Sequence, residues 1–522
     1  MDGDATYETP YADDESLFCR DLPTKPDRSA GTILVTGACG YIGGRLVPEL
    51  LARGYRVRRM VRGHTQPCRD PRPGIEDALA DALDPGSLRR ALEGVDVAYY
   101  LIHSMQLGPR EFAEADARAA RNFRLAAADA GVRRIIYLGG LGDARSELST
   151  HLRSRMEVAR ELQSGPVPVT ILRAAIIIGS GSASYEIIKN LVVKLPVILV
   201  PRWARSRCQP IAIRDVVKYL VGALETPRTA GGSYDIGGNE VMTYREMMET
   251  VARVLRRRRL FISFPLASLR MFAYAASLLT PVPAPITISL LGGLKNDVIC
   301  EDDEIRRLIP FEPISFRESL ARALTREEQD RVHTRWSDAY PPAHELAITL
   351  AEIEDHPKYS AHYSIVTDRD AQSLFDSICR IGGREGWFHG NWMWRLRGEF
   401  DRVIMGVGTS RGRKRSGALQ EHDVVDFWRV ERVRQGQRLL LRAEMKLPGM
   451  AWLEFTIDPE GDRNRLGITA WYRTRSLFGK LYWYVFLPFH EFIFRGLLRQ
   501  IEERSGPEHT ERKPRTPFRE DG

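Results

Sequence analysis

Short apolar runs alternate with amphipathic segments through the first half of the chain. Runs of this kind, separated by segments with helical spacing of apolar residues, are typical of strands buried in a parallel sheet with helices on both faces. We therefore expect an α/β fold, a Rossmann-type doubly wound parallel sheet. The expected strands are Ile33–Val35, Tyr55–Val61, Val95–Ile102, Arg134–Leu138 and Val169–Ile178, and the main helices between them are Tyr41–Arg53, Arg110–Gly131 and Leu148–Gln163.

The pattern changes after Ala323, where a charged stretch begins and period-two alternation replaces the strand–helix alternation. Alternating residues predict half-buried antiparallel strands, so the second half is expected to be an α+β domain that ends in a long helix, Gly479–Arg504. The predicted strands are Tyr359–Val366, Met393–Arg397, Val403–Val407, Asp423–Glu431, Arg438–Met445, Trp452–Ile457 and Leu466–Tyr472, with a helix at Asp370–Arg380.

These patterns divide the chain into two domains with polar, charged ends. Polar and proline-containing termini are typical of disorder. The predicted parts are a disordered tail at residues 1–30, the Rossmann-type α/β domain at 31–325, a linker at 326–358, the α+β domain at 359–504 and a second disordered tail at 505–522.

A glycine-rich turn connects the first strand to the first helix. Gly37, Gly40 and Gly43 follow the run Ile33–Val35 in a GxxGxxG spacing. Glycines at such a turn let the backbone approach a pyrophosphate at the N-terminus of the following helix. The alternative is an ordinary glycine-rich turn, but the strand before it and the helix after it favour dinucleotide binding.

The end of the second strand bears on which dinucleotide binds. An acidic residue there would accept hydrogen bonds from the ribose of NAD, whereas a cation would pair with the 2′-phosphate of NADP. The strand contains no acid and ends in Arg62, with Arg59 as a second candidate. The sequence thus favours NADP over NAD, against the alternative that these arginines are solvated surface charges.

Several motifs resemble those of one enzyme superfamily. The segment Thr36–Gly43 is similar to the TGxxGxxG motif of short-chain dehydrogenases/reductases, Asp81-Ala82 to their adenine-side pair, and Leu101–Ser104 to their nicotinamide-side segment. Residues 31 to roughly 325 resemble the atypical and extended branch, closest to NmrA-like proteins and to the NAD(P)H-binding accessory subunit of complex I. The resemblance implies as cofactor-binding residues Gly37, Cys39, Gly40, Tyr41, Ile42, Gly43, Arg62, Asp81, Ala82, Leu101, His103 and Arg155.

The catalytic residues of that superfamily are replaced. Its Tyr-x-x-x-Lys pair is represented by His151 and Arg155, and its strand-end serine falls in Leu138-Gly-Gly-Leu141. Four-residue spacing places His151 and Arg155 on one helical face, where the imidazole could donate a proton and the guanidinium could hold ribose hydroxyls. The alternative is a cleft that binds the nucleotide without catalysis.

The second domain resembles a helix-grip (START-like, SRPBCC) fold, in which antiparallel strands curl around a long C-terminal helix. Its motifs Asp426-Phe-Trp-Arg-Val and Glu444–Phe455 also look like those of an uncharacterised domain often appended to Rossmann modules. The resemblance implies an interior that takes a small apolar molecule. The many tryptophans of this half could line such a cavity or simply pack the core.

A basic and apolar segment follows the predicted helix Thr243–Leu255. Arg256–Arg259 precede the apolar stretch Leu260–Leu291, which Pro265 and Arg270 interrupt. The interruptions argue against a transmembrane helix. Docking on a membrane surface and a lid over an apolar substrate remain alternatives.

Composition excludes several classes of protein. The chain has 522 residues, of which 43% are hydrophobic and 28% charged, enough for two folded cores. The net charge of +8 is spread along the chain without a nucleic-acid-binding module, so no nucleic acid partner is expected. Six scattered cysteines without Cys-x-x-Cys spacing indicate neither a disulfide framework nor a metal site. The absence of a signal-like segment favours a cytoplasmic protein, with membrane association as an alternative.

Two functions are consistent with these observations. The first is an NADPH-preferring oxidoreductase that reduces an apolar carbonyl or quinone-like substrate. The second is a non-catalytic NADP(H)-binding redox sensor or assembly protein. The sequence indicates neither the substrate nor the oligomeric state.

Overall fold

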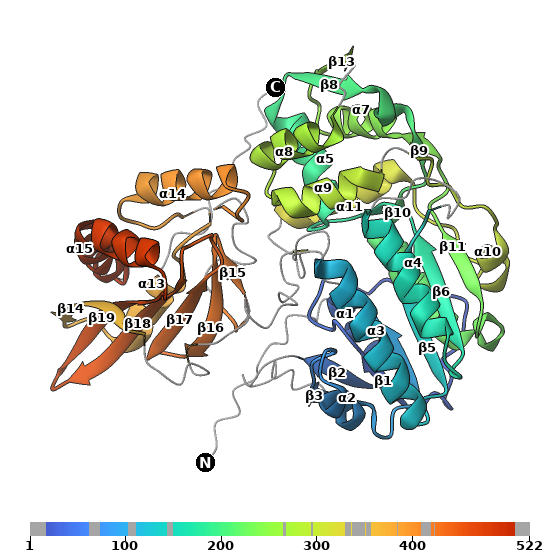
Figure 1. Ribbon diagram of the computed structural model, residues 1–522, viewed down its shortest axis with the longest axis horizontal. Coiled ribbons are helices and arrows are strands. Elements are labelled where there is room, and N and C mark those ends of the chain that lie inside the picture. The colour runs from blue at the N-terminus through green and yellow to red at the C-terminus, as the bar shows by residue number, and fades with distance from the viewer. Residues whose placement is uncertain are drawn as a thin grey trace. The chain divides into compact units, whose positions relative to one another are not determined.

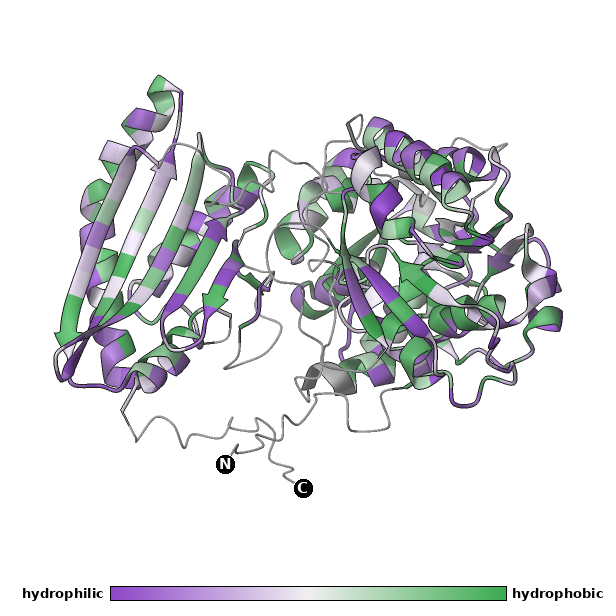
Figure 2. Cartoon of the chain, turned by 90° about the horizontal axis from the view of Figure 1, so that it is seen from below, coloured by the Kyte–Doolittle hydropathy of each residue, from purple (hydrophilic) through white to green (hydrophobic). Residues whose placement is uncertain are grey.

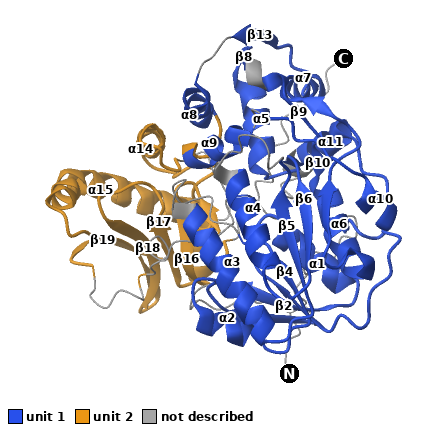
Figure 3. Cartoon of the chain, turned by 45° about the vertical axis from the view of Figure 1, so that its right-hand side comes forward, with its two compact units in different colours: residues 1–279, 285–342 blue, residues 280–284, 343–522 orange. Residues whose placement is uncertain are grey.

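The computed structural model describes residues 17–61, 74–102, 111–142, 150–264, 268–293, 296–328, 336, 350, 357–383, 385–408, 419–421 and 423–506. The chain forms two compact units (Figure 3). Unit 1 comprises residues 1–279 and 285–342, and unit 2 comprises residues 280–284 and 343–522. Each unit is described by itself.

A seven-stranded sheet forms the centre of unit 1, in the order β11–β6–β5–β4–β1–β2–β3 (Figure 1). All neighbouring strands are parallel, which confirms the predicted doubly wound Rossmann-type sheet. The strands are β1 (Thr32–Val35), β2 (Arg56–Val61), β3 (Ile75–Leu79), β4 (Val97–Tyr100), β5 (Arg134–Gly140), β6 (Val169–Ala174) and β11 (Ser233–Ile236). Strand order reverses between β1 and β4, and ligands of such sheets bind outside the carboxyl ends of the strands at that point.

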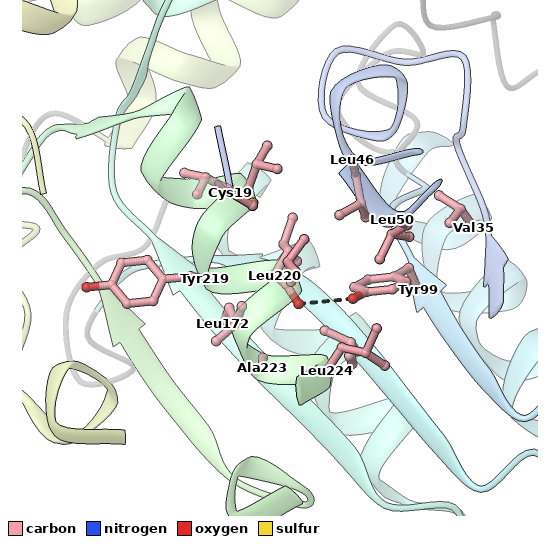
Figure 4. Packing of buried hydrophobic residues seen from close by; sticks show 14 of the residues in the cluster. Cys19, Val35, Leu46, Leu50, Tyr99, Leu172, Tyr219, Leu220, Ala223 and Leu224 are labelled. Carbon is pink, nitrogen blue, oxygen red and sulfur yellow. Dashed lines mark hydrogen bonds between the residues drawn. The ribbon is translucent and has the colours of Figure 1, made fainter. Parts of the chain in front are cut away.

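Helices cover both faces of the sheet because successive strand residues point to opposite sides. Ile33 and Val35 pack with α1 (Gly43–Ala52) and α6 (Ile213–Glu225), whereas Leu34 packs with the helices of the other face. Those helices are α2 (Pro85–Leu92), α3 (Glu111–Asp129) and α4 (Thr150–Gln163). Figure 4 shows part of the first core, where the Tyr99 hydroxyl donates to the Leu220 carbonyl oxygen at 3.0 Å.

The rest of unit 1 consists of short strand pairs and helices beyond the sheet. These elements are β7 (Ile177–Ile178), α5 (Ala183–Lys194), β8 (Val197–Pro201), β9 (Arg207–Cys208), β10 (Ile211–Ala212), β12 (Met242–Thr243), α7 (Tyr244–Val254), β13 (Leu260–Phe264), α8 (Leu269–Leu279), α9 (Ala284–Gly292), α10 (Glu304–Leu308) and α11 (Phe316–Glu328). The apolar stretch from Leu260 forms a strand and two helices. The carboxylate of Asp215, in the first turn of α6, accepts from the Ile314 N–H at 3.0 Å.

The N-terminal segment corrects the prediction of a disordered tail over 1–30. Residues 17–30 pack on unit 1, with Phe18, Cys19 and Leu22 buried in its core. The buried carboxylate of Glu49 accepts from the backbone N–H of Cys19 at 3.1 Å. The segment is held in place by burial of its apolar residues and by the carboxylate of Glu49, about 30 residues later in the chain. Neither interaction can be recognised from the composition of the segment, so the segment was predicted as disordered. Residues 1–16 and 507–522 lie outside the described residues.

Unit 2 contains a six-stranded antiparallel sheet in the order β14–β19–β18–β17–β16–β15. Figure 2 shows apolar and polar residues alternating along its long strands. The strands are β14 (Tyr359–Thr367), β15 (Val424–Val425), β16 (Trp428–Arg434), β17 (Arg438–Ala443), β18 (Met450–Glu460) and β19 (Arg463–Arg473), and the helices are α13 (Ala371–Ile378), α14 (Asn391–Val403) and α15 (Leu477–Arg504). The predicted antiparallel domain with a long final helix is confirmed.

One part of that prediction is wrong. The expected short strand Met393–Arg397 lies within the helix α14, and the expected strand Val403–Val407 begins at the last residue of this helix and continues into a turn. Its buried positions recur at helical spacing, from Trp394 to Gly398 and then to Asp401. The Asp401 carboxylate accepts from the backbone N–H groups of Gly408 and Lys446, at 2.8 and 2.7 Å. The helical pattern was hard to recognise because one of its buried positions is occupied by an acid, Asp401, whose carboxylate is hydrogen-bonded to backbone groups outside the helix.

Candidate functional site

The glycine-rich turn lies at the carboxyl end of β1, where the strand order reverses. Gly37 has φ +61°, a conformation that favours glycine, and a Cβ added there would lie 2.9 Å from the Leu101 carbonyl oxygen. A Cβ added at Gly43 would lie 2.3 Å from the carbonyl oxygen of Gly37. The start of α1 therefore packs against the turn so closely that no side chain fits between them.

The partial positive charge at the N-terminus of α1 is not neutralised by a capping side chain or by an acidic residue in its first turn. Its N-cap is Ile42, which makes no side-chain cap hydrogen bond, and its first turn contains no acidic residue. A helix start of this kind, reached through a glycine turn, favours binding of a phosphate group. The predicted turn residues Cys39, Gly40 and Tyr41 lie between Gly37 and this helix start, and Cys39 is exposed.

The ends of neighbouring strands bring other predicted residues to the same edge. The Leu101 N–H, just after β4, donates to the Thr36 hydroxyl at 2.8 Å, which ties this strand end to the glycine turn. After β3, the Asp81 carboxylate accepts from the Leu83 N–H at 2.8 Å, and the Ala82 carbonyl oxygen accepts from the Asn122 amide at 3.1 Å. His103 lies outside the described residues.

The two arginines predicted at the 2′-phosphate have different surroundings. Arg59 on β2 forms a buried, two-bond ion pair with Asp77 on β3, with distances of 2.6 and 2.8 Å. Its charge is thereby already balanced within the sheet. Arg62 lies outside the described residues, one position beyond the end of β2.

The two predicted catalytic residues lie on α4, which packs against the carboxyl end of β5. A Cβ added at Gly140 would lie 2.9 Å from a terminal methyl of Leu152 and 3.8 Å from Cγ of Arg155. Arg155 is thus at the edge of the sheet where the cofactor residues gather. His151 belongs to the first turn of α4, and its side chain is outside the described part.

Two features beside this edge were missed at the sequence level. Arg45, buried in α1, donates to the carbonyl oxygens of Tyr41 and Ser180 at 3.0 and 2.9 Å, so it links the glycine turn to the loop after β7. Asp116 on α3 is also buried, and its carboxylate accepts from the Ser154 hydroxyl at 3.4 Å. A charged residue on the apolar face of a helix was the available signal in both cases.

Tyr137, on β5, is hydrogen-bonded to α4. Its hydroxyl donates to the Arg155 carbonyl oxygen at 3.2 Å. Burial raises the pKa of Tyr137, and the Asp116 carboxylate raises it further, against the opposing effect of the Arg155 cation. The tyrosine is therefore a neutral donor that holds the backbone of α4 next to β5.

Glu444, at the start of the motif Glu444–Phe455 in unit 2, forms an ion pair with Arg429 at 2.5 Å, so its charge is balanced. Within the described residues, no group of three or more His, Cys, Asp or Glu side chains could hold a metal ion. None of the helices in the described part is both long and apolar enough to cross a bilayer.

Two family models match the chain. The model of the NmrA-like family matches residues 29–290, and that of DUF2867, a protein family of unknown function, matches residues 354–497. The chain is 23% identical over 287 residues to NADH dehydrogenase (ubiquinone) 1 alpha subcomplex subunit 9, mitochondrial, of Arabidopsis thaliana, covering 52% of this chain and 71% of that protein.

Two reductases are also similar. The chloroplastic divinyl chlorophyllide a 8-vinyl-reductase of Oryza sativa subsp. indica is 28% identical over 255 residues, which cover 46% of this chain and 62% of that protein. Cinnamoyl-CoA reductase 1 of Petunia hybrida is 33% identical over 121 residues, which cover 22% of this chain and 36% of that protein. The chain thus spans less than two thirds of either reductase.

Among solved structures, a nucleoside-diphosphate-sugar epimerase from Staphylococcus aureus is similar, with a TM-score of 0.47 and 18% identity over 55% of this chain and 99% of that one. The family model, by contrast, extends over half of this chain, from the segment before β1 to α9. The chain belongs to the NmrA-like family.

Proposed function

We propose that the chain is an NADPH-preferring oxidoreductase that reduces an apolar carbonyl or quinone-like substrate. The observation that carries the proposal is the glycine turn at the reversal of strand order, with Gly43 packed on Gly37 and an uncapped helix start behind it. This combination provides N–H donors and a positive helix end without a side chain in the way. The names of the two similar plant reductases support a reductase activity.

The residues at the strand ends suit the parts of a dinucleotide. The turn from Gly37 to Gly43 would hold the pyrophosphate, Asp81 and Ala82 the adenine, and Leu101 the nicotinamide side. When bound, NADPH supplies a hydride to the electrophilic carbon of a substrate. The carbonyl oxygen then needs a proton, which His151 would donate from its imidazolium form. Arg155, beside the end of β5, would hold the ribose hydroxyls.

The preference for NADPH rests on Arg62. Arg59 is paired with Asp77 in the sheet, so the 2′-phosphate would have to be recognised by another cation. Arg62 follows the last residue of β2, where a cation can pair with that phosphate.

A non-catalytic NADP(H)-binding sensor or assembly protein is the second candidate. At the end of β5 the superfamily's serine is replaced by glycines, and the side chain of Leu152 comes within 2.9 Å of a Cβ added at Gly140. An apolar contact thus stands where a proton relay would be expected. The similar Arabidopsis protein is named as a subunit of NADH dehydrogenase, which supports a role in an assembly.

We further propose that unit 2 has a helix-grip (START-like) fold and binds a small apolar molecule. Its first strand, β14, pairs with its last, β19, and the intervening strands form a meander closed by α15. Aromatic side chains fill the side of the sheet that faces α15, including Tyr472 and Trp483, stacked at 5.6 Å between ring centroids. The apolar character of this interior would favour an apolar ligand over a polar one.

Titration of the full chain with NADPH and NADH, followed by nucleotide fluorescence, tests the proposal. We expect NADPH to bind at least about tenfold more tightly than NADH, equivalent to about 1.4 kcal/mol. Arg62→Ala should remove this difference, whereas Arg56→Ala, an exposed arginine at the other end of β2, should preserve it. Absence of binding by either nucleotide would overturn both candidate functions.

Stopped-flow oxidation of bound NADPH with panels of quinones and aldehydes separates the two candidates. Oxidation that depends on the acceptor supports the reductase. Tight binding without oxidation by any acceptor supports the sensor or assembly protein.

A further inference from the structure

The first half of α15 carries apolar side chains around its whole circumference. One side packs into the core of unit 2 through Trp483 and Phe494. The other side is here called the outer face of α15. Its apolar residues recur mainly at three- and four-residue spacing, and their side chains are 47% to 80% exposed. The outer face consists of Leu477, Phe478, Leu481, Tyr484, Val485, Phe489 and Phe492.

A second apolar stripe lies on α14. Trp392, Leu396, Phe400 and Val403 are exposed at helical spacing and form the outer face of α14. The two helices lie on the same side of the sheet (Figures 1 and 3). They meet where the ring of His389, just before α14, contacts that of Phe492 at 4.9 Å between centroids.

Exposed apolar residues in such number require an explanation. Single exposed apolar side chains are ordinary, but contiguous exposed apolar surfaces on soluble proteins mark interaction sites. A helix that is apolar on all sides is normally buried. The apolar composition of the two outer faces is therefore that of a surface that is buried in contact with a binding partner.

Charges around these faces indicate what covers them. Arg475 and Lys480 are exposed beside the start of α15, and Arg395 is exposed on α14. The acids in these two helix segments are fewer, since Glu491 is paired with Arg495 and only Glu399 is exposed nearby on α14.

We propose that the outer faces of α15 and α14 dock on an anionic lipid bilayer. Helices that lie in the headgroup region combine Trp, Tyr, Phe and Leu on the buried side with Lys and Arg at the border. Exposed cations beside such helices, here Arg395, Arg475 and Lys480, are attracted to anionic lipids. We infer that α14 and α15 would lie on the surface of the bilayer, since none of the described helices meets the length and hydropathy of a membrane span.

This assignment differs from the segment that the sequence suggested for membrane contact. That segment begins at β13, where Leu260, Ile262 and Phe264 are exposed on one face. β13 belongs to unit 1 and offers a matched control, because its substitutions change equally exposed apolar side chains in the other unit.

Flotation of the full chain with lipid vesicles tests the proposal. The vesicles contain phosphatidylcholine alone or with about one third phosphatidylserine. We expect binding to the anionic vesicles only. Leu481→Glu combined with Phe489→Glu should reduce the bound fraction at least about tenfold, because two apolar anchors become anions. Leu260→Glu combined with Ile262→Glu should leave it unchanged.

Three outcomes of this experiment would contradict the proposal. If the unmodified chain floats with neither vesicle, the proposal is overturned. Equal loss in the β13 variant would assign the contact to unit 1 and overturn it as well. If light scattering without lipid shows a dimer that the α15 variant converts to a monomer, a second copy covers the face instead. Circular dichroism of both variants verifies that unit 2 remains folded.

Discussion

The guanidinium of Arg59 and the carboxylate of Asp77 form two hydrogen bonds, 2.6 and 2.8 Å long, between adjacent strands β2 and β3. The two residues are register partners in the sheet, and both side chains are nearly buried. Arg59 thus belongs to the structural framework of unit 1. This pairing separates its role from that of Arg62.

Removing one partner of the pair is expected to destabilise unit 1. Arg59→Met leaves the Asp77 carboxylate buried and unpaired, which should lower the free energy of unfolding by about 3 kcal/mol. The double variant Arg59→Met, Asp77→Leu should recover most of this loss. Calorimetric melting checks the stability, and nucleotide titration should give an unchanged ratio of NADPH to NADH affinity. A changed ratio would mean that Arg59 recognises the 2′-phosphate.

A methyl group at Gly43 is expected to disrupt the proposed nucleotide site. The new Cβ would lie 2.3 Å from the Gly37 carbonyl oxygen and 2.8 Å from the Ala38 Cα, so the turn and helix must separate. We expect Gly43→Ala to weaken NADPH binding at least about tenfold. Gly86→Ala on α2 is the matched control, since its nearest neighbour would be at 3.4 Å. Unchanged binding in Gly43→Ala would refute the assignment of the turn.

Replacement of His151 tests its proposed role as proton donor. His151→Phe should reduce the rate of NADPH oxidation by about 100-fold while NADPH affinity stays the same, because general acids contribute roughly that factor. Arg153→Ala, an exposed residue of the same helix, serves as the control. Single-turnover kinetics measures the rate. If His151→Phe retains full activity, the proton comes from another group.

Unit 2 is expected to lose stability in mild acid because of His490. Burial lowers the pKa of this imidazole to about 4, and among the described residues its Nδ1 has no hydrogen-bond partner. The unfolded chain, with an imidazole pKa near the ordinary 6.5, binds the proton more readily. The contribution of the neutral imidazole to the free energy of unfolding of unit 2 is therefore fully present above pH 6.5 and declines as the pH falls toward 4.

The expected loss between pH 7 and pH 5 is about 1–2 kcal/mol. Melting of the full chain at both pH values measures it, with the transition of unit 2 identified by tryptophan fluorescence. His490→Phe keeps an aromatic ring beside Trp483 and Phe494 and should reduce the difference by that amount. An equal pH dependence in this variant would show that another group titrates.

Most of the secondary structure of unit 1 was predictable because its signals are local. Apolar runs, the turn Gly37–Gly43 and the capping residues Asp84 and Thr243 all act within a few residues of where they stand. The prediction failed where a distant group satisfies a buried one. The carboxylates of Glu49 and Asp401 accept from backbone N–H groups remote in the sequence, and each occurs where a prediction was wrong.

By itself, the amino-acid sequence determined the alternation of strands and helices, the change to antiparallel structure in the second half and the position of the glycine turn. These depend on periodicity and on backbone freedom, which are properties of neighbouring residues. Only the tertiary structure decided that Arg59 is paired with Asp77, that Arg155 lies beside the end of β5 and that, within the described part of the chain, one side of α15 is exposed. Those outcomes depend on which strands and helices become neighbours, because pairing and burial join residues far apart in the chain.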